Sequence, residues 1–241
     1  MAYVALPEGA RGTDGTREVG TVVLHGEHPR DAAARAAAEE LGLAVEPTSL
    51  RHVASHLEDD VDGVQRHVLR VVYDAEVREP SPTAGMPAGP PPIAPPSGRG
   101  RGSGPVKVQR SGAYAVLAHD GRILLTRLAY TKVWTLPGGG IDHGEDPIDA
   151  VRREVHEETG LPLTDARLLD VDSVHFTGHA PDGKLEDFHA VRLLFTGTVP
   201  LDVEPRVVEV GGSSDAAAWR PIAELDERER RRLAFALSHV P

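Results

Sequence analysis

Residues 139–161 read GGIDHGEDPIDAVRREVHEETGL, and this stretch is the most informative part of the sequence. Glu154, Glu157 and Glu158 are three or four positions apart, so a helix would place them on one surface. Like charges at this spacing destabilise a helix by roughly 0.2–0.5 kcal/mol per pair. Because carboxylate oxygens are the ligands that Mg²⁺ prefers, the three glutamates are candidate metal ligands.

The predicted helix has clear ends. Asp146 is a suitable N-cap, Pro147 suits the first helical position, and Gly160 suits the position after the last turn. A stripe that can face a core is formed by Ile148, Val151 and Val155. The carboxylates lie mostly off this stripe, and Arg153 can hold Glu145 through a two-atom contact. Taken alone, an acidic pair on such a helix usually indicates a solvated surface.

The whole pattern argues against that simpler interpretation. Gly139, Glu145 and the run from Arg153 to Leu161 have the spacing of the Nudix box, and the stretch resembles that box at every defining position. The segment before it, residues 134–139, is similar to the segment that leads into the box in this family. Residues 219–225 resemble the tryptophan-containing segment that often precedes the last helix. The resemblance covers about residues 107–239.

The pattern of residues predicts an α/β domain. Residues 113–118 and 123–127 are β-rich and are joined by Asp120-Gly121, a strong hairpin signal. Further strands are expected at 167–174 and 189–199, and a terminal helix at 228–238. The resemblance implies the α/β/α sandwich with a mixed sheet that Nudix proteins share.

The resemblance also implies a chemistry. Family members hydrolyse a nucleoside diphosphate linked to another group, by attack of water on phosphorus. Mg²⁺, or Mn²⁺ in its place, would be held by Glu154, Glu157 and Glu158, would neutralise charge on the phosphate oxygens and would lower the pKa of a bound water. The residues expected to take a catalytic part are Glu157, Glu154, Arg153 and Glu186.

The identity of the general base stays open at this stage. Glu157 is one candidate, and some family members use a carboxylate on a later loop, for which Glu186 and Asp187 are candidates; a solvated hairpin loop is the simpler interpretation of that pair. Substrate contacts are expected from Gly138, Gly139, Gly140 and Trp134, although Trp134 equally suits a core position. Direct roles are not expected for the histidines at 143, 156, 175 and 189, since each alone is more often structural or exposed.

The sequence does not identify the substrate. No proline or tyrosine stands after the box where many ADP-ribose or dinucleoside polyphosphate hydrolases have one. The Trp134-x-x-Pro-Gly-Gly entry slightly favours a nucleoside triphosphate or modified nucleotide, and ADP-ribose or a nucleotide sugar remains an alternative. A non-catalytic nucleotide sensor is the second class of function. An isopentenyl-diphosphate isomerase would want a catalytic cysteine, and the chain has none.

The chain also contains an internal repeat. Moving the box back by 118 positions aligns residues 25–43 with residues 143–161, and most of the aligned residues are identical. Ala36 then stands opposite Glu154, and Val19 and Thr21 replace Pro137 and Gly139. Residue 1 falls opposite His119, so no counterpart of the strand at 112–118 is expected. We interpret residues 1–78 as a degenerate, non-catalytic Nudix-like module, or one truncated by a wrongly assigned start codon.

Composition sets the remaining expectations. The segment 79–106 is rich in proline and glycine and is expected to link the first module to a catalytic domain at 107–241. The net charge of −11 argues against general nucleic-acid affinity. We expect no membrane contact, and a cytoplasmic location, because there is no secretory signal and no cysteine. The two copies are expected to pack as a pseudo-dimer within one chain, with a homodimer as the alternative.

Overall fold

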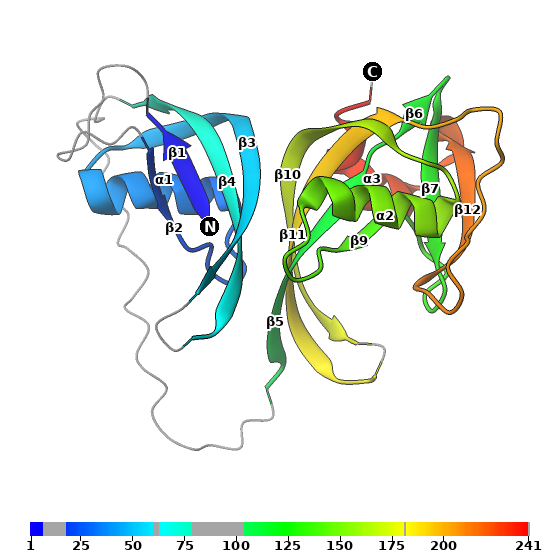
Figure 1. Ribbon diagram of the computed structural model, residues 1–241, viewed down its shortest axis with the longest axis horizontal. Helices are drawn as coiled ribbons and strands as arrows, with labels where there is room; N and C mark the ends of the chain where they lie inside the picture. Colours follow the sequence, from blue (N-terminus) through cyan, green and yellow to red (C-terminus); the bar gives the residue numbers. More distant parts are fainter. Residues whose placement is uncertain (7–17, 60–62, 79–103, 181, 241) are drawn as a thin grey trace.

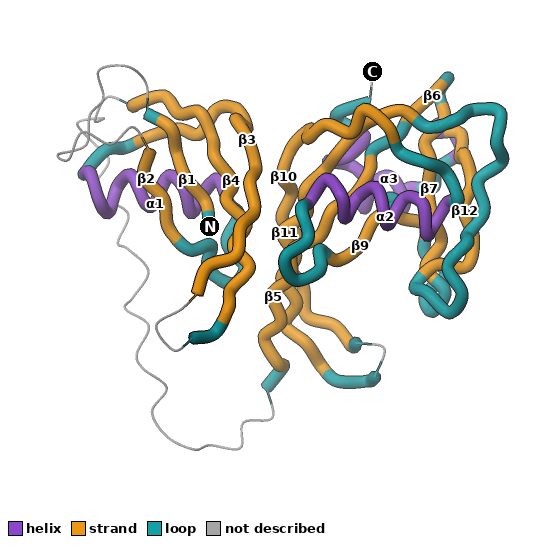
Figure 2. Tube along the Cα trace, in the orientation of Figure 1, coloured by secondary structure: helices purple, strands orange, loops and turns teal. Residues whose placement is uncertain are grey.

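The computed structural model describes residues 1–6, 18–59, 63–78, 104–180 and 182–240. Within these residues the chain forms two halves, each with one long helix lying along a four-stranded sheet (Figures 1 and 2). The second half adds another four-stranded sheet and a C-terminal helix. The predicted α/β class is confirmed. Most of the proposed linker, residues 79–103, lies outside the described residues.

The first half uses one helix and four strands. Their order in the sheet is β2-β1-β4-β3, with β1 parallel to β4 and the other pairs antiparallel. The elements are β1 (Ala2–Ala5), β2 (Glu18–Thr21), α1 (Pro29–Leu41), β3 (Val45–Asp59) and β4 (Gln65–Val77). Alanines 32, 33, 36 and 37 of α1 are fully buried, and their small side chains let the helix lie close to the sheet.

The second half repeats this arrangement. Its first sheet has the order β10-β11-β5-β9, with β5 parallel to β11 and the other pairs antiparallel. Helix α2 packs against this sheet, in the place that α1 takes in the first half (Figure 1). The elements are β5 (Val106–Ala115), β9 (Gly138–Gly140), α2 (Pro147–Thr159), β10 (Thr164–His179) and β11 (Leu185–Thr198).

The second sheet of this half has the order β12-β7-β6, with β8 paired to β7. Asp120 and Gly121, both with positive φ, form the tight turn between β6 and β7 that the sequence predicted. The remaining elements are β6 (Ala118–His119), β7 (Arg122–Leu128), β8 (Trp134–Thr135), β12 (Ser214–Pro221), the 3-10 turn Ile222–Glu224 and α3 (Glu227–Leu237). None of the helices among the described residues is long and apolar enough to cross a membrane.

One expectation about the first half is wrong. The strand at 112–118 does have a counterpart, because β1 runs parallel to β4 as β5 runs parallel to β11. Ala2 lies opposite Val71, and Ala113 lies opposite Leu193. The described part of the first half contains no counterpart of β6, β7 and β12, so its helix has one sheet beside it where α2 has two.

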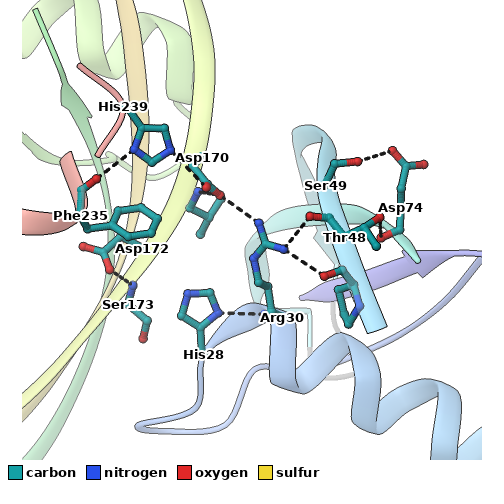
Figure 3. Close-up of polar contacts among 12 residues, drawn as sticks. His28, Arg30, Thr48, Ser49, Asp74, Asp170, Asp172, Ser173, Phe235 and His239 are labelled. Atoms are coloured by element: carbon teal, nitrogen blue, oxygen red, sulfur yellow. Dashed lines mark hydrogen bonds and ion pairs between the residues drawn. The ribbon is translucent and has the colours of Figure 1, made fainter. Parts of the chain in front are cut away.

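The two halves are in contact along β3 and β10, which face each other in Figure 1. Arg30, at the start of α1, donates hydrogen bonds to the carbonyl oxygens of Pro47 and Thr48, both at 3.1 Å, and pairs with Asp170 of β10 at 3.5 Å (Figure 3). Gln109 of β5 donates to the carbonyl oxygen of Val23 at 3.3 Å. Polar contacts from several elements therefore fix one half against the other.

Candidate active site

Helix α2 is held at both ends by the residues that the sequence predicted. The carboxylate of Asp146 accepts a hydrogen bond from the amide of Ile148 at 2.9 Å, and Pro147 takes the first turn. Gly160 ends the helix in the left-handed conformation. Val151 and Val155 are fully buried against the core. The helix therefore presents its glutamates from a fixed frame.

Arg153 is the centre of the acidic network. Its guanidinium donates two hydrogen bonds to Glu145, from Nε at 2.8 Å and from Nη2 at 2.9 Å, as predicted. Nη1 also reaches Glu154 at 2.7 Å and Glu157 at 3.2 Å, and Nη2 donates to the carbonyl oxygen of Gly140. The same cation thus connects the loop before the helix to two of the three predicted metal ligands.

Glu158 lies on the buried side of the helix. Only 2% of the residue is exposed. Its carboxylate accepts hydrogen bonds from the amide of Gly138 and from hydroxyl groups on β7 and at the start of β12, contributed by Thr126, Ser213 and Ser214. Burial raises the pKa of Glu158, and these donors act in the opposite direction. The expectation that the carboxylates avoid the apolar face is therefore wrong for Glu158.

Glu154 lies against the glycine strand β9. A Cβ atom added to Gly139 would stand 2.6 Å from Oε1 of Glu154, so a larger residue there would displace this carboxylate from its present position. Burial raises the pKa of Glu154; the hydrogen bond and charge of Arg153 act in the opposite direction, and the carboxylates of Glu158 and Glu157 make smaller upward contributions. A carboxylate buried among like charges is stabilised in its ionised form by a bound cation.

The donor chemistry around Glu154 fits a hard divalent cation. All three predicted ligands offer carboxylate oxygens, which suit Mg²⁺ or Mn²⁺. Glu154 and Glu157 both turn toward Arg153, whereas Glu158 turns to its hydroxyl partners on the other side. The three carboxylates do not converge on one point in this geometry. That they hold one metal together stays a prediction.

The predicted substrate-contacting residues lie beside this network. Gly138 has φ +144°, and a Cβ there would stand 2.3 Å from the carbonyl oxygen of Ala113, so the strand requires glycine. Gly140 faces open space. Trp134, on β8, is partly buried, with the guanidinium groups of Arg127 and Arg220 at 5.8 and 5.1 Å from its ring centre. Its surroundings fit the structural interpretation as well as a substrate contact.

Glu186 occupies a different part of the second half. It lies at the start of β11, on the β10–β11 hairpin that extends beyond the sheet, opposite Gly178 (Figure 1). The neighbouring candidate, Asp187, pairs with His175 at 2.6 Å and with His25 at 3.3 Å. Asp187 thus lies in a separate cluster that includes a residue of the first half.

The first half has the same loop and helix without the full acidic set. Arg35 contacts Glu27 at 2.9 Å and Glu39 at 3.2 Å, as Arg153 contacts Glu145 and Glu157. Ala36, which stands where the second half has Glu154, is fully buried. The described first half also lacks a strand to supply hydroxyl partners like those of Glu158.

Sequence reasoning missed Thr126 and Ser214, which hold Glu158 from strands distant in the chain. It also missed the backbone amides of Arg206, Val208 and Glu209, which donate to the last carbonyl oxygens of α2, those of Glu157 and Thr159. One signal was available for Glu158 itself. It follows Val151 by seven positions, so the helical period places it in line with the apolar stripe.

Comparisons with known proteins agree on one family. A model of the NUDIX domain matches residues 108–237. The chain is 39% identical over 107 residues to an RNA pyrophosphohydrolase of Mesorhizobium japonicum, which covers 40% of this chain and 61% of that protein. A shorter match to an RNA pyrophosphohydrolase of Bartonella bacilliformis is 61% identical over 31 residues, covering 13% of this chain and 18% of the relative. The chain thus spans less than two thirds of these curated relatives.

Two solved structures are each similar to about half of this chain. The MutT NUDIX hydrolase from Burkholderia pseudomallei is 33% identical with a TM-score of 0.44, and the match covers 56% of this chain and 99% of that one. The NUDIX domain of Shewanella oneidensis NrtR, solved with ADP ribose, is 21% identical with a TM-score of 0.41 and covers 56% and 90%.

Proposed function

Since the chain belongs to the NUDIX domain family, we propose that residues 107–241 form a hydrolase that cleaves a pyrophosphate bond in a nucleoside diphosphate linked to another group. The observation that carries this proposal is the contact of Arg153 with Glu145, Glu154 and Glu157 at once. This network places ionisable carboxylates beside a glycine strand, which suits the approach of a phosphate and a cation.

Mg²⁺ is the cofactor that we propose, with Mn²⁺ as a substitute; when bound, it neutralises phosphate charge and lowers the pKa of a water. The residues that would hold it are Glu154 and Glu157, with Glu158 as the third. Glu158 also fixes β9, because its carboxylate accepts from the amide of Gly138. The backbone at Gly139 and Gly140 is free of side chains, so a phosphate can approach it closely.

Glu157 is the base that we propose. Its side chain is 33% exposed, against 14% for Glu154, so water reaches it more easily. Arg153 orients its carboxylate from one side. Glu186 is the second candidate, and its place on the β10–β11 hairpin would require the hairpin to approach the helix when substrate binds.

The substrate that we propose is a nucleoside triphosphate or a modified nucleotide, with ADP-ribose or a nucleotide sugar as alternatives. The curated relatives are RNA pyrophosphohydrolases, and this favours a second candidate, a triphosphate at the 5′ end of an RNA. The net charge of −11 disfavours a long contact with an RNA backbone. A substrate recognised mainly through its triphosphate satisfies both observations.

We also propose that residues 1–78 form a Nudix-like module without catalytic activity. The shared strand order, β2-β1-β4-β3 against β9-β5-β11-β10, supports a common origin of the two halves. Ala36 in place of a ligand carboxylate supports the loss of metal binding. The contact of Arg30 with Asp170 supports packing of the two modules as a pseudo-dimer within the chain.

The experiment that tests the function measures product release from a panel of substrates by wild type and Glu157→Gln, with Mg²⁺ and with EDTA. The panel contains nucleoside triphosphates, oxidised nucleotides, ADP-ribose, nucleotide sugars, dinucleotides and a 5′-triphosphorylated RNA. Cleavage that needs both the metal and Glu157 supports the proposal and identifies the substrate. No turnover, with a nucleotide still raising the melting temperature, would replace it by the second class of function, a nucleotide sensor.

A further inference from the structure

A cluster of three imidazole rings and one carboxylate lies where the β10–β11 hairpin meets the loop before α1. His175 and His189 come from the two strands of the hairpin, and Asp187 lies between them in the chain. His25 comes from the first half, 150 positions before His175. None of these side chains belongs to the acidic network around Arg153.

The side chains of His25, His175 and Asp187 bring their potential metal-binding atoms close together. Nε2 of His175 lies 2.6 Å from Oδ1 of Asp187, and Nε2 of His25 lies 3.3 Å from its Oδ2. The ligand atoms of the three side chains all lie within 4.8 Å of one another. Among the described residues, no other group of three histidines, aspartates or glutamates meets this condition. The cluster is therefore more compact than the three glutamates of α2.

The loop that carries His25 is fixed on the hairpin. The rings of His25 and His175 lie edge to face, with their centres 5.2 Å apart. A Cβ atom added to Gly26 would stand 2.9 Å from Nδ1 of His175, so the loop backbone lies directly against that ring. Two residues before His25, the carbonyl oxygen of Val23 accepts from Gln109. Several independent contacts thus hold the His25 loop in place on the hairpin.

Two of the three side chains in this cluster are largely shielded from solvent. The side chain of His25 is 16% exposed and that of Asp187 is 20% exposed. Nε2 of His25 is buried and has no hydrogen-bond partner, although it faces the carboxylate. Two imidazole nitrogens and a carboxylate oxygen around one point are a ligand set.

We propose that His25, His175 and Asp187 form a second metal site, separate from the α2 glutamates, that binds Zn²⁺ or a similar borderline divalent ion. Imidazole nitrogen together with one carboxylate suits zinc, whereas Mg²⁺ prefers oxygen ligands alone. Three protein ligands leave a fourth position for water or a further group. His189 lies near it, with its ring centre 5.6 Å from that of His25, and its Nε2 is engaged by Ser173 at 2.9 Å.

The site would join the two halves of the chain. One ligand lies in the loop before α1 and two lie in the β10–β11 hairpin, so the ion would fix the hairpin to the first half. Since the three side chains would be ligands only in the native arrangement, metal binding adds to the stability of that arrangement. The site would thereby give the catalytically incomplete half a structural role.

The test measures zinc retained by untagged full-length protein, since a histidine tag would itself bind the ion. Wild type is incubated with ZnCl₂, desalted and analysed for metal. We expect about one equivalent of zinc and a higher melting temperature with zinc than with chelator. Glu157→Gln should retain the same equivalent, because the site does not depend on the catalytic network. Zinc retention by this variant tests the metal site alone, whereas its loss of turnover tests the proposed hydrolase, so the two proposals can fail separately.

The variants that remove the ligands are His25→Ala, His175→Ala and Asp187→Asn. Each should weaken zinc binding by at least about 100-fold, since even the loss of an outer partner of a metal ligand commonly weakens binding by 10–100-fold. The matched control is His179→Ala, which removes an exposed histidine four positions further along β10. Asp187→Asn keeps the shape of the side chain, so its fold can be checked by circular dichroism without metal. Retention of zinc by Asp187→Asn and His175→Ala, or its absence from wild type, would overturn the proposal.

Discussion

Arg35 and Arg153 make the same contacts in the two halves, 118 positions apart. Each guanidinium donates from Nε and Nη2 to a glutamate eight positions earlier, Glu27 or Glu145. Nη1 donates to a glutamate four positions later, Glu39 or Glu157. Nη2 also donates to a backbone carbonyl oxygen, that of Val22 or Gly140. The difference is one further contact of Arg153, with Glu154 at 2.7 Å. The first half keeps the arginine–glutamate contacts although it lacks the third glutamate of the box. We therefore infer that these contacts have a structural role apart from catalysis.

This pair gives the first prediction. Arg153→Ala removes the cation that orients Glu154 and Glu157, and should lower kcat/KM by about 100-fold, since small misplacements of catalytic groups commonly cost this much. Arg35→Ala should lower the melting temperature and change kcat/KM by less than about threefold. Steady-state kinetics and thermal unfolding of both variants check this. An equal loss of turnover in the two variants would show that the first half contributes to catalysis.

The second prediction concerns two adjacent glycines of β9. Gly139→Ala would place a methyl group 2.6 Å from Oε1 of Glu154 and must displace that carboxylate. Gly140→Ala adds the same group to open space. Titration of each variant with Mg²⁺ should show binding weakened by on the order of 10-fold in Gly139→Ala and unchanged in Gly140→Ala. Wild-type affinity in Gly139→Ala would mean that Glu154 is not a ligand.

The third prediction concerns the buried carboxylate of Glu158. Ser214 is buried and donates to Glu158, whereas Ser213 is exposed and donates at 3.3 Å. Ser214→Ala leaves a buried acceptor with one partner fewer and should lower the free energy of unfolding by about 1–3 kcal/mol. Ser213→Ala should cost less than about 0.5 kcal/mol. Urea unfolding of the two variants compares them, and an equal loss would contradict the assignment of Ser214 as the stronger partner.

The fourth prediction is a pH dependence at the start of α1. Nδ1 of His28 accepts a hydrogen bond from the amide of Arg30 at 3.1 Å, so the cap requires a neutral ring. Burial lowers the pKa of His28. The unfolded chain therefore binds this proton more readily, and the stabilisation is complete above about pH 6.5 and is lost as the pH falls through the lowered pKa.

His28→Asn keeps a capping side chain that does not titrate in this range. The variant should lose less melting temperature than wild type between pH 7.5 and pH 5. Asp146 caps α2 at the equivalent position, so that helix is the comparison within the same molecule. An identical loss in wild type and variant would exclude His28 as the source of the acid sensitivity.

Features that depend on neighbouring residues were predictable from the sequence. The ends of α2, the turn at Asp120-Gly121 and the contact of Arg153 with Glu145 all join residues a few positions apart. In each case a local rule applies: a cap, a positive φ, or two side chains that a helix and its leading loop bring together.

Features that depend on tertiary packing were not predicted. The partners of Glu158 lie 32 and 56 positions away on other strands, and no local pattern pairs them with the helix. The counterpart of β5 was not predicted because the offset of 118 that aligns the two boxes does not hold for the strands before them. Strand pairing aligns Ala2 with Ala113, an offset of 111, so the two copies differ in length between their first strand and the box. The His25 cluster likewise forms only when the halves meet.

The hydrogen bonds from residues 206–209 to the last turn of α2 have a practical consequence for protein engineering. Arg206, Val208 and Glu209 donate their amides to the carbonyl oxygens of Thr159 and Glu157, so the turn of helix that carries Glu157 is completed by a distant loop. A tag, label or new chain end inserted at 206–209 would loosen that turn. Residues 201–203, a few positions earlier, are exposed and should tolerate an insertion better.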